Sequence, residues 1–279
     1  MSEPTEIKIK IKDCPKASEG VHNWIYYAAM RLKEAGCPKA EAAKIIRAGM
    51  SRPPNPANEV NTTVDAAYDR DHTPGPAWPT LNVLARDKLF SARFTLAELA
   101  ASSPVQGADL CPAVVLAAMF RPVELVCIGW DKNKFDTRPF SEWTKLEGKQ
   151  FIVPSPMSKL VGLTQAGRPS KKSNDNTGPR RYQVVEFDAG AVDEHAAVAR
   201  ELGRFAPLVL CVHSGGKSLH SWFKVEGWPE DRQRKFFEYA VSLGADPKMW
   251  TGSQFTRMPG GTRQGGIRQV IHYFNPANT

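Results

Sequence analysis

The sequence has little of what marks secreted, disulfide-rich or membrane-spanning proteins. It has only five cysteines in 279 residues and no CxxC pair, which argues against a disulfide framework and against a cysteine-rich zinc site. Its apolar stretches, such as Leu110 to Phe120, are far shorter than the ~20 residues that cross a bilayer. No basic segment followed by an apolar one opens the chain, so no secretory signal is predicted. We therefore expect a cytoplasmic protein without zinc and without a membrane partner.

The composition is that of a folded globular protein with a basic balance. Hydrophobic residues make up 42% of the chain and charged residues 24%, which excludes a wholly disordered or collagen-like chain. The formal net charge is +8 and the pI is about 9.3. A basic balance of this size favours an anionic partner, with nucleic acid as the first candidate.

The N-terminal quarter has the patterns of a small helical domain. Residues 6–12, EIKIKIK, alternate with period 2, as in an edge strand or a frayed tail. Residues 20–70 then predict three helices with tight turns between them: HNWIYYAAMRLKEAG, PKAEAAKIIRAG and PANEVNTTVDAAYD. Breaker residues follow in DHTPGPAWP. We predict a helical domain over residues 1–72, a linker over 73–80 and a catalytic domain over 81–279.

The last third of the chain has the clearest order of elements. The patterns predict, in sequence, a strand at Gln183–Phe187, a helix at Asp193–Leu202, strands at Pro207–His213 and Leu219–Glu226, a helix at Glu230–Leu243 and a strand at Arg268–Phe274. This β-α-β-β-α-β order is the split arrangement of RRM and ferredoxin-like folds. Such an α+β core has one antiparallel sheet with both helices on one face and the other face free for a cleft.

An additional αβ unit precedes this core. Helical stretches at Leu96–Ala101 and Val114–Met119 and strands at Glu124–Ile128 and Gln150–Val153 are predicted. A polar loop from Ser158 to Arg181 follows, with one acid and six cations. A loop of this length inside a compact domain is usually functional or disordered.

Two carboxylates end the first strand of the predicted core. Glu186 and Asp188 flank Phe187, so the period of a strand places both on one face of the sheet. Close carboxylates repel each other, and an oxygen-seeking ion such as Mg²⁺ or Mn²⁺ relieves that repulsion. Two solvated acids at a strand end are the alternative.

A second group of polar residues joins two strands of the core. The segment from Ser214 to His220 reads SGGKSLH, with Gly216, Lys217 and Ser218 inside it. The glycines let backbone N–H groups approach an anion, and the side chains add donors. It is not a P-loop, because the segment leads into a strand rather than a helix. A glycine hairpin with an incidental lysine and histidine is the alternative.

The C-terminal stretch is rich in arginine and has no acid after position 246. Arg257 and Arg263 flank a glycine-rich segment, and Arg268 follows. Such guanidinium groups suit phosphate chelation. Asp246 precedes Pro247, which fits a turn residue as well as a third metal ligand.

The ordered set of motifs resembles the archaeo-eukaryotic primase superfamily, the primase-polymerases of archaea, eukaryotes, plasmids and phages. In that family an acidic pair precedes a small-residue loop that ends in histidine, and a third acid follows. The stretches NTGPRRYQVVEFD and RMPGGTRQGGIRQ are similar to those of primases on bacterial mobile elements. The similarity covers roughly residues 110–279. The first acid here is Glu186, where the family more often has aspartate.

The resemblance implies a DNA primase or primase-polymerase that builds primers on single-stranded DNA from nucleoside triphosphates. Glu186, Asp188 and Asp246 would be the catalytic residues and the ligands of two Mg²⁺ or Mn²⁺ ions. The nucleotide-binding residues would be Ser214, Gly216, Lys217, Ser218, His220 and Arg257. The nucleic-acid-binding residues would be Lys171, Lys172, Arg180, Arg181, Arg263 and Arg268. A separately encoded helicase would be a further partner.

The N-terminal helices have a resemblance of their own. The pattern Ala29-x-x-Leu32-x-x-Ala35-Gly36, followed by Glu59-Val60 and Ala66-x-x-Asp69, is similar to the small helical domain that accompanies these primases. In the family it often follows the catalytic core, whereas here it precedes it.

Two other functions are compatible with the same residues. One is a non-catalytic nucleic-acid-binding module of a replication initiator, which would bind DNA without incorporating nucleotides. The other is a metal-dependent nuclease that uses Glu186 and Asp188. Nucleases of that kind commonly carry a lysine two residues after the first acid, and here Asp188 occupies that place.

Overall fold

The computed structural model describes residues 13–15, 21–69, 77–106 and 110–279, and within it the chain forms two compact units, Met1–Ala77 and Trp78–Thr279. The segment at residues 6–12, expected as an edge strand or a frayed tail, and residues 73–76 of the predicted linker lie outside the described residues. None of the helices in the described ranges has the length and apolar character that crossing a membrane requires.

The first unit contains three helices, as predicted: α1 (Val21–Glu34), α2 (Lys39–Ala48) and α3 (Glu59–Tyr68). Their apolar faces form one core around Ile25, Leu32 and Ile46. The carboxylate of Glu59, which is 5% exposed, accepts two hydrogen bonds from Arg52 at 2.9 and 3.0 Å and one from the backbone N–H of Asn55 at 2.8 Å. This network ties the proline-rich loop to the start of α3.

The described part of the second unit begins with three short helices and contains three sheets. The helices are α4 (Val83–Ser91), α5 (Leu96–Ala101) and α6 (Pro112–Met119). One antiparallel sheet has the order β2-β1-β3-β9 and is formed by β1 (Leu125–Gly129), β2 (Phe135–Pro139), β3 (Phe151–Ile152) and β9 (Thr256–Arg257). The predicted polar loop contains the small sheet of β4 (Gly162–Leu163) and β5 (Pro169–Ser170). Five 3₁₀ turns are formed by Phe140–Glu142, Leu146–Gly148, Asn174–Asn176, Pro247–Trp250 and Pro276–Asn278.

The C-terminal third forms the second four-stranded sheet. Its elements are β6 (Tyr182–Val185), α7 (Val192–Leu202), β7 (Leu208–His213), β8 (Leu219–Lys224), α8 (Glu230–Ser242) and β10 (Val270–Phe274). The α+β class and the order of elements along the chain agree with the prediction, although the short strand β9 interrupts it before β10. All neighbouring strands are antiparallel.

The lateral order of this sheet is β10-β7-β8-β6. Strand β8 lies between β6 and β7, and β7 lies between β8 and β10, so both β-α-β units are split. The last strand pairs with the second strand of the core, whereas a ferredoxin-like sheet pairs it with the first. The predicted ferredoxin-like strand order is therefore wrong for the last strand, β10. The reason is that β7 and β8 form a central hairpin, which leaves β6 at an edge.

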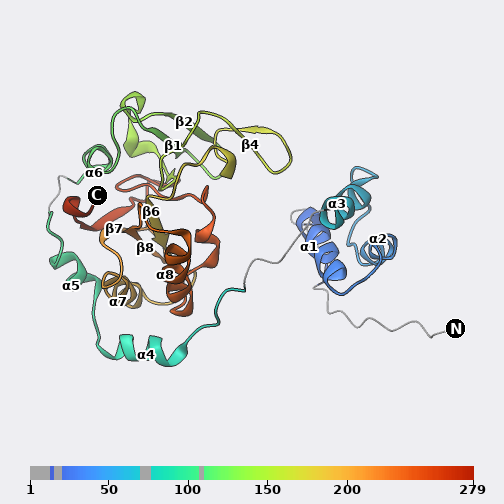
Figure 1. Cartoon of the computed structure of the whole chain (residues 1–279), viewed down its shortest axis with the longest axis horizontal. Coiled ribbons are helices and arrows are strands. Elements are labelled where there is room, and N and C mark those ends of the chain that lie inside the picture. The colour runs from blue at the N-terminus through green and yellow to red at the C-terminus, as the bar shows by residue number, and fades with distance from the viewer. Residues whose placement is uncertain (1–12, 16–20, 70–76, 107–109) are drawn as a thin grey trace. The chain divides into compact units, whose positions relative to one another are not determined.

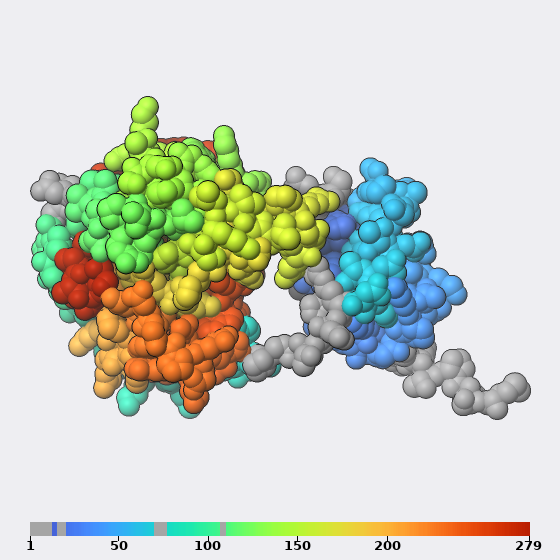
Figure 2. Space-filling model, turned by 45° about the horizontal axis from the view of Figure 1, so that its top comes forward, coloured from blue at the N-terminus to red at the C-terminus, as the bar shows by residue number. Residues whose placement is uncertain are grey.

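The two faces of this sheet have different neighbours. Figure 1 shows α7 and α8 on one side of β6, β7 and β8, and the strands β1 and β2 on the other. Phe223 of β8 packs edge-on against Phe236 of α8 with ring centroids 5.2 Å apart. Trp222, the preceding residue of β8, points to the opposite face, where its ring packs against that of Tyr182. In the space-filling view the green-to-yellow and the orange-to-red residues form one continuous body (Figure 2).

Candidate active-site cleft

The three predicted acids line one cleft near the end of β6. Val185 is paired with Ser221 across the sheet, so Glu186 comes opposite His220. The Nδ1 atom of His220 lies 2.7 Å from Oε2 of Glu186. Asp246 is brought to the same place by its backbone N–H, which donates to the carbonyl oxygen of Glu186 at 2.9 Å.

Phe187, between the two acids, points to the other side of the strand. Its buried ring stacks on that of His195 in α7, with centroids 4.4 Å apart and planes 6° from parallel. Burial is the main cause that lowers the pKa of His195 below its usual value. Glu186 and Asp188 both line one cleft, as their spacing predicted, and Phe187 also belongs to its lining although its ring stacks on α7.

Asp246 has the turn role that the sequence left open, and its side chain also lies at the cleft where a metal ligand was predicted. Its carboxylate accepts a hydrogen bond from the backbone N–H of Lys248 at 3.0 Å and so caps the turn at Pro247–Trp250. The same side chain, 10% exposed, also lines the cleft. Asp246 is therefore both a turn residue and one of the carboxylates that line the cleft.

The cleft has a volume of about 630 Å³, which is within the range of small-molecule sites. All three acids and all six residues predicted to bind nucleotide lie in its wall. Its lining residues are Lys132, Phe151, Glu186, Phe187, Asp188, Ser214, Gly216, Lys217, Ser218, His220, Asp246, Lys248, Gln254, Phe255, Thr256, Arg257 and Arg263.

The β7–β8 loop is held against the acidic strand. Ser214 and Ser218 exchange two hydrogen bonds, from Ser214 N to Ser218 O at 2.9 Å and from Ser218 N to Ser214 Oγ at 3.2 Å. The Oγ of Ser218 accepts from the backbone N–H of Phe187 at 3.0 Å. The loop and the acids are thus parts of one hydrogen-bonded structure.

Glycine is favoured in this loop, most strictly at position 215. Gly215 has a φ of +70°, and a Cβ there would lie 2.6 Å from Ile267 and 3.0 Å from the carbonyl oxygen of Arg268. A Cβ on Gly216 would lie 2.8 Å from the guanidinium of Arg263. The C-terminal arginine segment therefore approaches the loop as closely as glycine permits.

His220 is buried, with 5% of its surface exposed. Its Nδ1 is 2.7 Å from Oε2 of Glu186 and 2.7 Å from Oγ1 of Thr256. These contacts leave Nε2 as the ring nitrogen that can meet a ligand in the cleft. Thr256 belongs to β9, so the histidine joins the two four-stranded sheets.

Two guanidinium groups complete the basic side of the cleft. The Arg257 guanidinium lies 4.7 Å from the centroid of the Phe151 ring. Burial, and then the charge of Arg263, lower the pKa of Arg257 below its usual value. Arg263 donates from Nη1 to the carbonyl oxygen of Ser214 at 3.4 Å. Neighbouring cations of this kind favour an anionic ligand between them.

The other predicted nucleic-acid-binding residues do not line the cleft. Arg181, with a side chain 14% exposed, pairs with Glu124 at 2.6 Å and with Glu226 at 3.0 Å. Arg180 donates to the Gln183 side chain and to the Trp250 carbonyl, and burial lowers its pKa to about 10. These two arginines join elements of the fold, which the sequence did not indicate.

The lysines of the polar loop and Arg268 have different surroundings. The Lys172 ammonium lies 4.7 Å from the Phe135 ring centroid and 4.4 Å from that of Phe255, and burial lowers its pKa. Lys171 is 43% exposed and lies 3.7 Å from Asp136. Arg268 is exposed. Lys171 and Arg268 therefore keep surface that a nucleic acid can contact.

The first sheet adds lining residues that sequence reasoning missed. Lys132 lies between β1 and β2, Phe151 is in β3, and Thr256 is in β9. Strand β9 has only two residues, so no periodic signal marks it. Strand β3 lies within the predicted strand at Gln150–Val153, but nothing local indicates that it faces the acids. Only the pairing of the sheet brings these residues to the acids.

A divalent ion such as Mg²⁺ needs oxygen ligands, and the cleft offers carboxylates. Within the described ranges no three histidine, cysteine, aspartate or glutamate side chains are placed to enclose a metal. Mg²⁺ is commonly held by one or two carboxylates together with substrate phosphates and water, rather than by a protein cage. Glu186 and Asp188, in one cleft with several cations, fit that chemistry.

Comparisons with known proteins give one distant likeness. No family model matches the chain, and no curated protein matches it. Among solved structures, the AEP domain of the cyanophage S-2L primase-polymerase (PrimPol) is similar over 59% of this chain and 91% of its own, with 19% sequence identity and a TM-score of 0.37. At this TM-score we draw neither fold nor function from the likeness.

Proposed function

We propose that the chain is a template-directed nucleotidyltransferase, a DNA primase or primase-polymerase that synthesises primers on single-stranded DNA. The observation that carries this proposal is the placement of three acids and six potential phosphate-binding residues in one cleft of about 630 Å³. Acids, loop and arginines occur in the order of the archaeo-eukaryotic primase motifs, and the fold brings them together.

The acids form the reactive end of the cleft in this proposal. Glu186 and Asp188, with Asp246 beside them, hold Mg²⁺ or Mn²⁺ together with the phosphates of the incoming nucleotide. The bound ions would supply charge neutralisation at the triphosphate and activation of the attacking 3′-hydroxyl. Phosphoryl transfer otherwise depends on positioning, so the rigidity of the strand end matters as much as its charge.

The loop and the arginines form the triphosphate-binding end. Lys217 and Arg257 line the cleft as cations, and Ser214 and Ser218 fix the backbone of the loop beside them. His220 contributes Nε2, because Nδ1 is held by Glu186 and Thr256. In this arrangement His220 binds a phosphate with one nitrogen and orients an acid with the other.

The template is assigned to Arg263 in the cleft and to two exposed cations outside it. Arg263 lines it, and Lys171 and Arg268 are exposed. Contacts from such cations to phosphates weaken with salt and do not depend on base sequence. We do not assign Arg180 and Arg181 to the template, because both are engaged by other residues of the fold.

A non-catalytic nucleic-acid-binding module is the second candidate. One observation favours it: within the described ranges no three potential ligands are placed to enclose a metal. Such a module would bind single-stranded DNA equally well with Mg²⁺ and with a chelator.

Incubation of the full chain with a single-stranded template, labelled nucleotides and Mg²⁺ or Mn²⁺ separates the two candidates. Metal-dependent incorporation supports the transferase, and tight binding without incorporation supports the module.

A further inference from the structure

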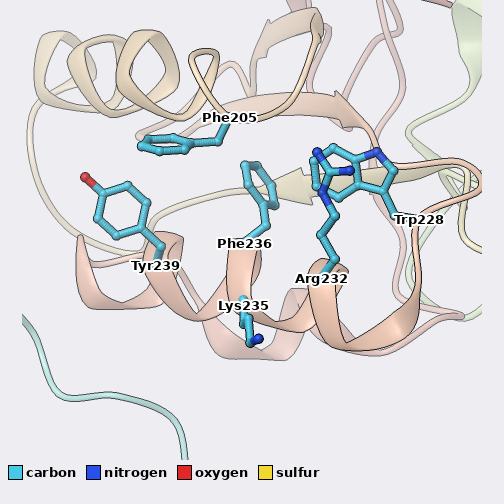
Figure 3. A pocket seen from close by; sticks show the side chains of 6 residues that line it. All are labelled: Phe205, Trp228, Arg232, Lys235, Phe236 and Tyr239. Carbon is cyan, nitrogen blue, oxygen red and sulfur yellow. The ribbon is translucent and has the colours of Figure 1, made fainter.

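A second, more apolar pocket lies on helix α8, away from the acids. Its volume is about 480 Å³, which suits a ligand of nucleotide size and is too small for a folded partner. Figure 3 shows its side chains: Phe205, Trp228, Arg232, Lys235, Phe236 and Tyr239.

The aromatic rings of this pocket form two edge-to-face pairs. Phe205 and Tyr239 are 5.4 Å apart with planes at 77°, and Trp228 and Phe236 are 6.1 Å apart with planes at 89°. In Figure 3 the first pair and Trp228 lie on opposite sides of Phe236. Edge-to-face pairs leave ring faces uncovered, and a planar ligand can stack on them.

This pocket is distinct from the cleft of the acids. Phe236 packs against Phe223, which points to the helix side of the sheet. Glu186 and His220 line the cleft together with Thr256 of the other sheet. The sheet therefore separates the two sites, and a ligand on α8 is not at the reacting centre.

Two cations at the pocket have no carboxylate partner among the residues that the structure describes. The Arg232 guanidinium lies 3.8 Å from the centroid of the Trp228 ring. No ion pair or hydrogen bond is formed by the side chains of Arg232 or Lys235 in those ranges. Glu201, the acid near Tyr239, is paired with Arg204 and with the Tyr239 hydroxyl. The residues that line the pocket therefore include two cations and no carboxylate.

Phe205 follows α7 and is a large apolar side chain that is 52% exposed at this pocket. An exposed phenylalanine beside three other aromatic rings and two free cations has the chemistry of a base-stacking platform with phosphate contacts.

We propose that this pocket binds one unstacked base of a single strand of DNA, with the adjoining phosphate at Arg232 and Lys235. The base stacks against the rings around Phe236, and the site tolerates any base because each has a π-face. The pocket gives the strand a second point of attachment, separate from the cleft. The binding does not require nucleotide incorporation, so it can be tested whether or not the proposed function holds.

Photo-crosslinking locates the contact directly. The full chain is irradiated with a single-stranded oligodeoxynucleotide that carries 5-iodouracil, and the crosslinked peptides are identified by mass spectrometry. We expect crosslinks to Phe205, Trp228 or Tyr239, both in the wild-type chain and in an Asp188→Asn variant. Crosslinks confined to residues of the cleft would overturn the proposal.

Matched variants provide the second measurement. Phe205→Ala and Lys235→Ala should each lower the affinity for the oligonucleotide, about fivefold or more for the ring. The controls are Val123→Ala and Lys88→Ala, which remove an exposed apolar and an exposed basic side chain outside the pocket. Equal affinities in all four variants would contradict the proposal.

A competition arm distinguishes a peptide ligand. An acidic peptide with a single phenylalanine has the same general complementarity to rings and cations. If that peptide prevents crosslinking of the oligonucleotide to the pocket and an excess of oligonucleotide does not displace it, the pocket is a peptide site and the proposal is wrong. Displacement by the oligonucleotide supports the proposal.

Discussion

The Nδ1 atom of His220 lies 2.7 Å from Oε2 of Glu186, and the two side chains are 7% and 20% exposed. The contact joins the predicted phosphate-binding loop to the predicted metal-binding strand. It also occupies Nδ1 of the histidine, which leaves Nε2 for other contacts. The acid and the loop are therefore expected to act as one unit, and a change in either should affect both.

His220→Ala should weaken nucleotide binding by about 1–3 kcal/mol, the usual cost of a lost buried or charge-assisted hydrogen bond. This corresponds to about a 5- to 150-fold rise in Kd. Nucleotide titration of the wild type and the variant measures it. His213→Ala is the matched control, because His213 ends β7 but does not line the cleft. Equal affinities in the two variants would support the alternative interpretation of the loop as a glycine hairpin with an incidental lysine and histidine.

Gly215→Ala should destabilise the chain by about 1–3 kcal/mol and reduce nucleotide binding, because strain and a clash coincide there. The φ is +70°, and the new Cβ would lie 2.6 Å from Ile267. Gly227→Ala is the control, with a φ of +76° and no atom within 4 Å of its Cβ. Thermal unfolding and nucleotide titration follow both variants. If Gly227→Ala has the same effect on binding, close packing of the loop against the C-terminal segment is not what matters.

Glu124→Gln should lower the free energy of unfolding at pH 7 by about 1.5–3 kcal/mol, the range for hydrogen bonds to charged groups. The Arg181 guanidinium lowers the pKa of Glu124 from 4.5 to about 2. A carboxylate with a lowered pKa stabilises the fold fully above its unfolded pKa, and that stability is lost as the pH falls from about 4.5 to about 2.

Urea titrations at several pH values measure this effect. The wild type should lose stability below pH 4.5 more steeply than Glu124→Gln. The exposed residue Glu147 gives the control Glu147→Gln, which should follow the wild type. Parallel curves for wild type and Glu124→Gln would show that the ion pair with Arg181 contributes nothing to folding.

Removal of the helical unit should affect the start of a chain more than its extension. A protein that begins near Pro76 keeps every described residue of the cleft, which lies between positions 132 and 263. The helices carry cations that can hold template or the initiating nucleotide, such as Arg31 and Lys44, both exposed. Initiation on bare template and extension of an annealed primer are measured side by side. An equal loss in both assays, or a loss in neither, would exclude a role in initiation.

Much of the second unit could be predicted because its local patterns are strong. Helices α7 and α8 and strands β7 and β8 were expected within a few residues of their observed bounds. The i, i+2 spacing of Glu186 and Asp188 placed both acids in one cleft, and Phe187 stacks on the opposite side. Periodicity and turn residues are properties of short segments, so the sequence alone contains them.

What could not be predicted depends on contacts between distant segments. The pairing of β10 with β7 rather than β6 depends on the whole sheet. Arg181 pairs with Glu124, 57 residues earlier in the chain, and nothing local distinguishes it from a free surface arginine. Thr256 reaches His220 through a two-residue strand, which is too short to have a recognisable pattern.

The central claim is that Glu186 and Asp188 serve metal-dependent nucleotide incorporation. The most direct measurement is incorporation of labelled nucleotides on single-stranded DNA by the wild type, by Glu186→Gln and by Asp188→Asn, with Mg²⁺, with Mn²⁺ and with a chelator. Both substitutions keep side-chain size and remove a charge. The account predicts synthesis by the wild type only with metal, and a loss of about 100-fold or more in each variant, with binding of the oligonucleotide nearly unchanged. Incorporation that survives both substitutions together, or binding without any incorporation by the wild type, would contradict it.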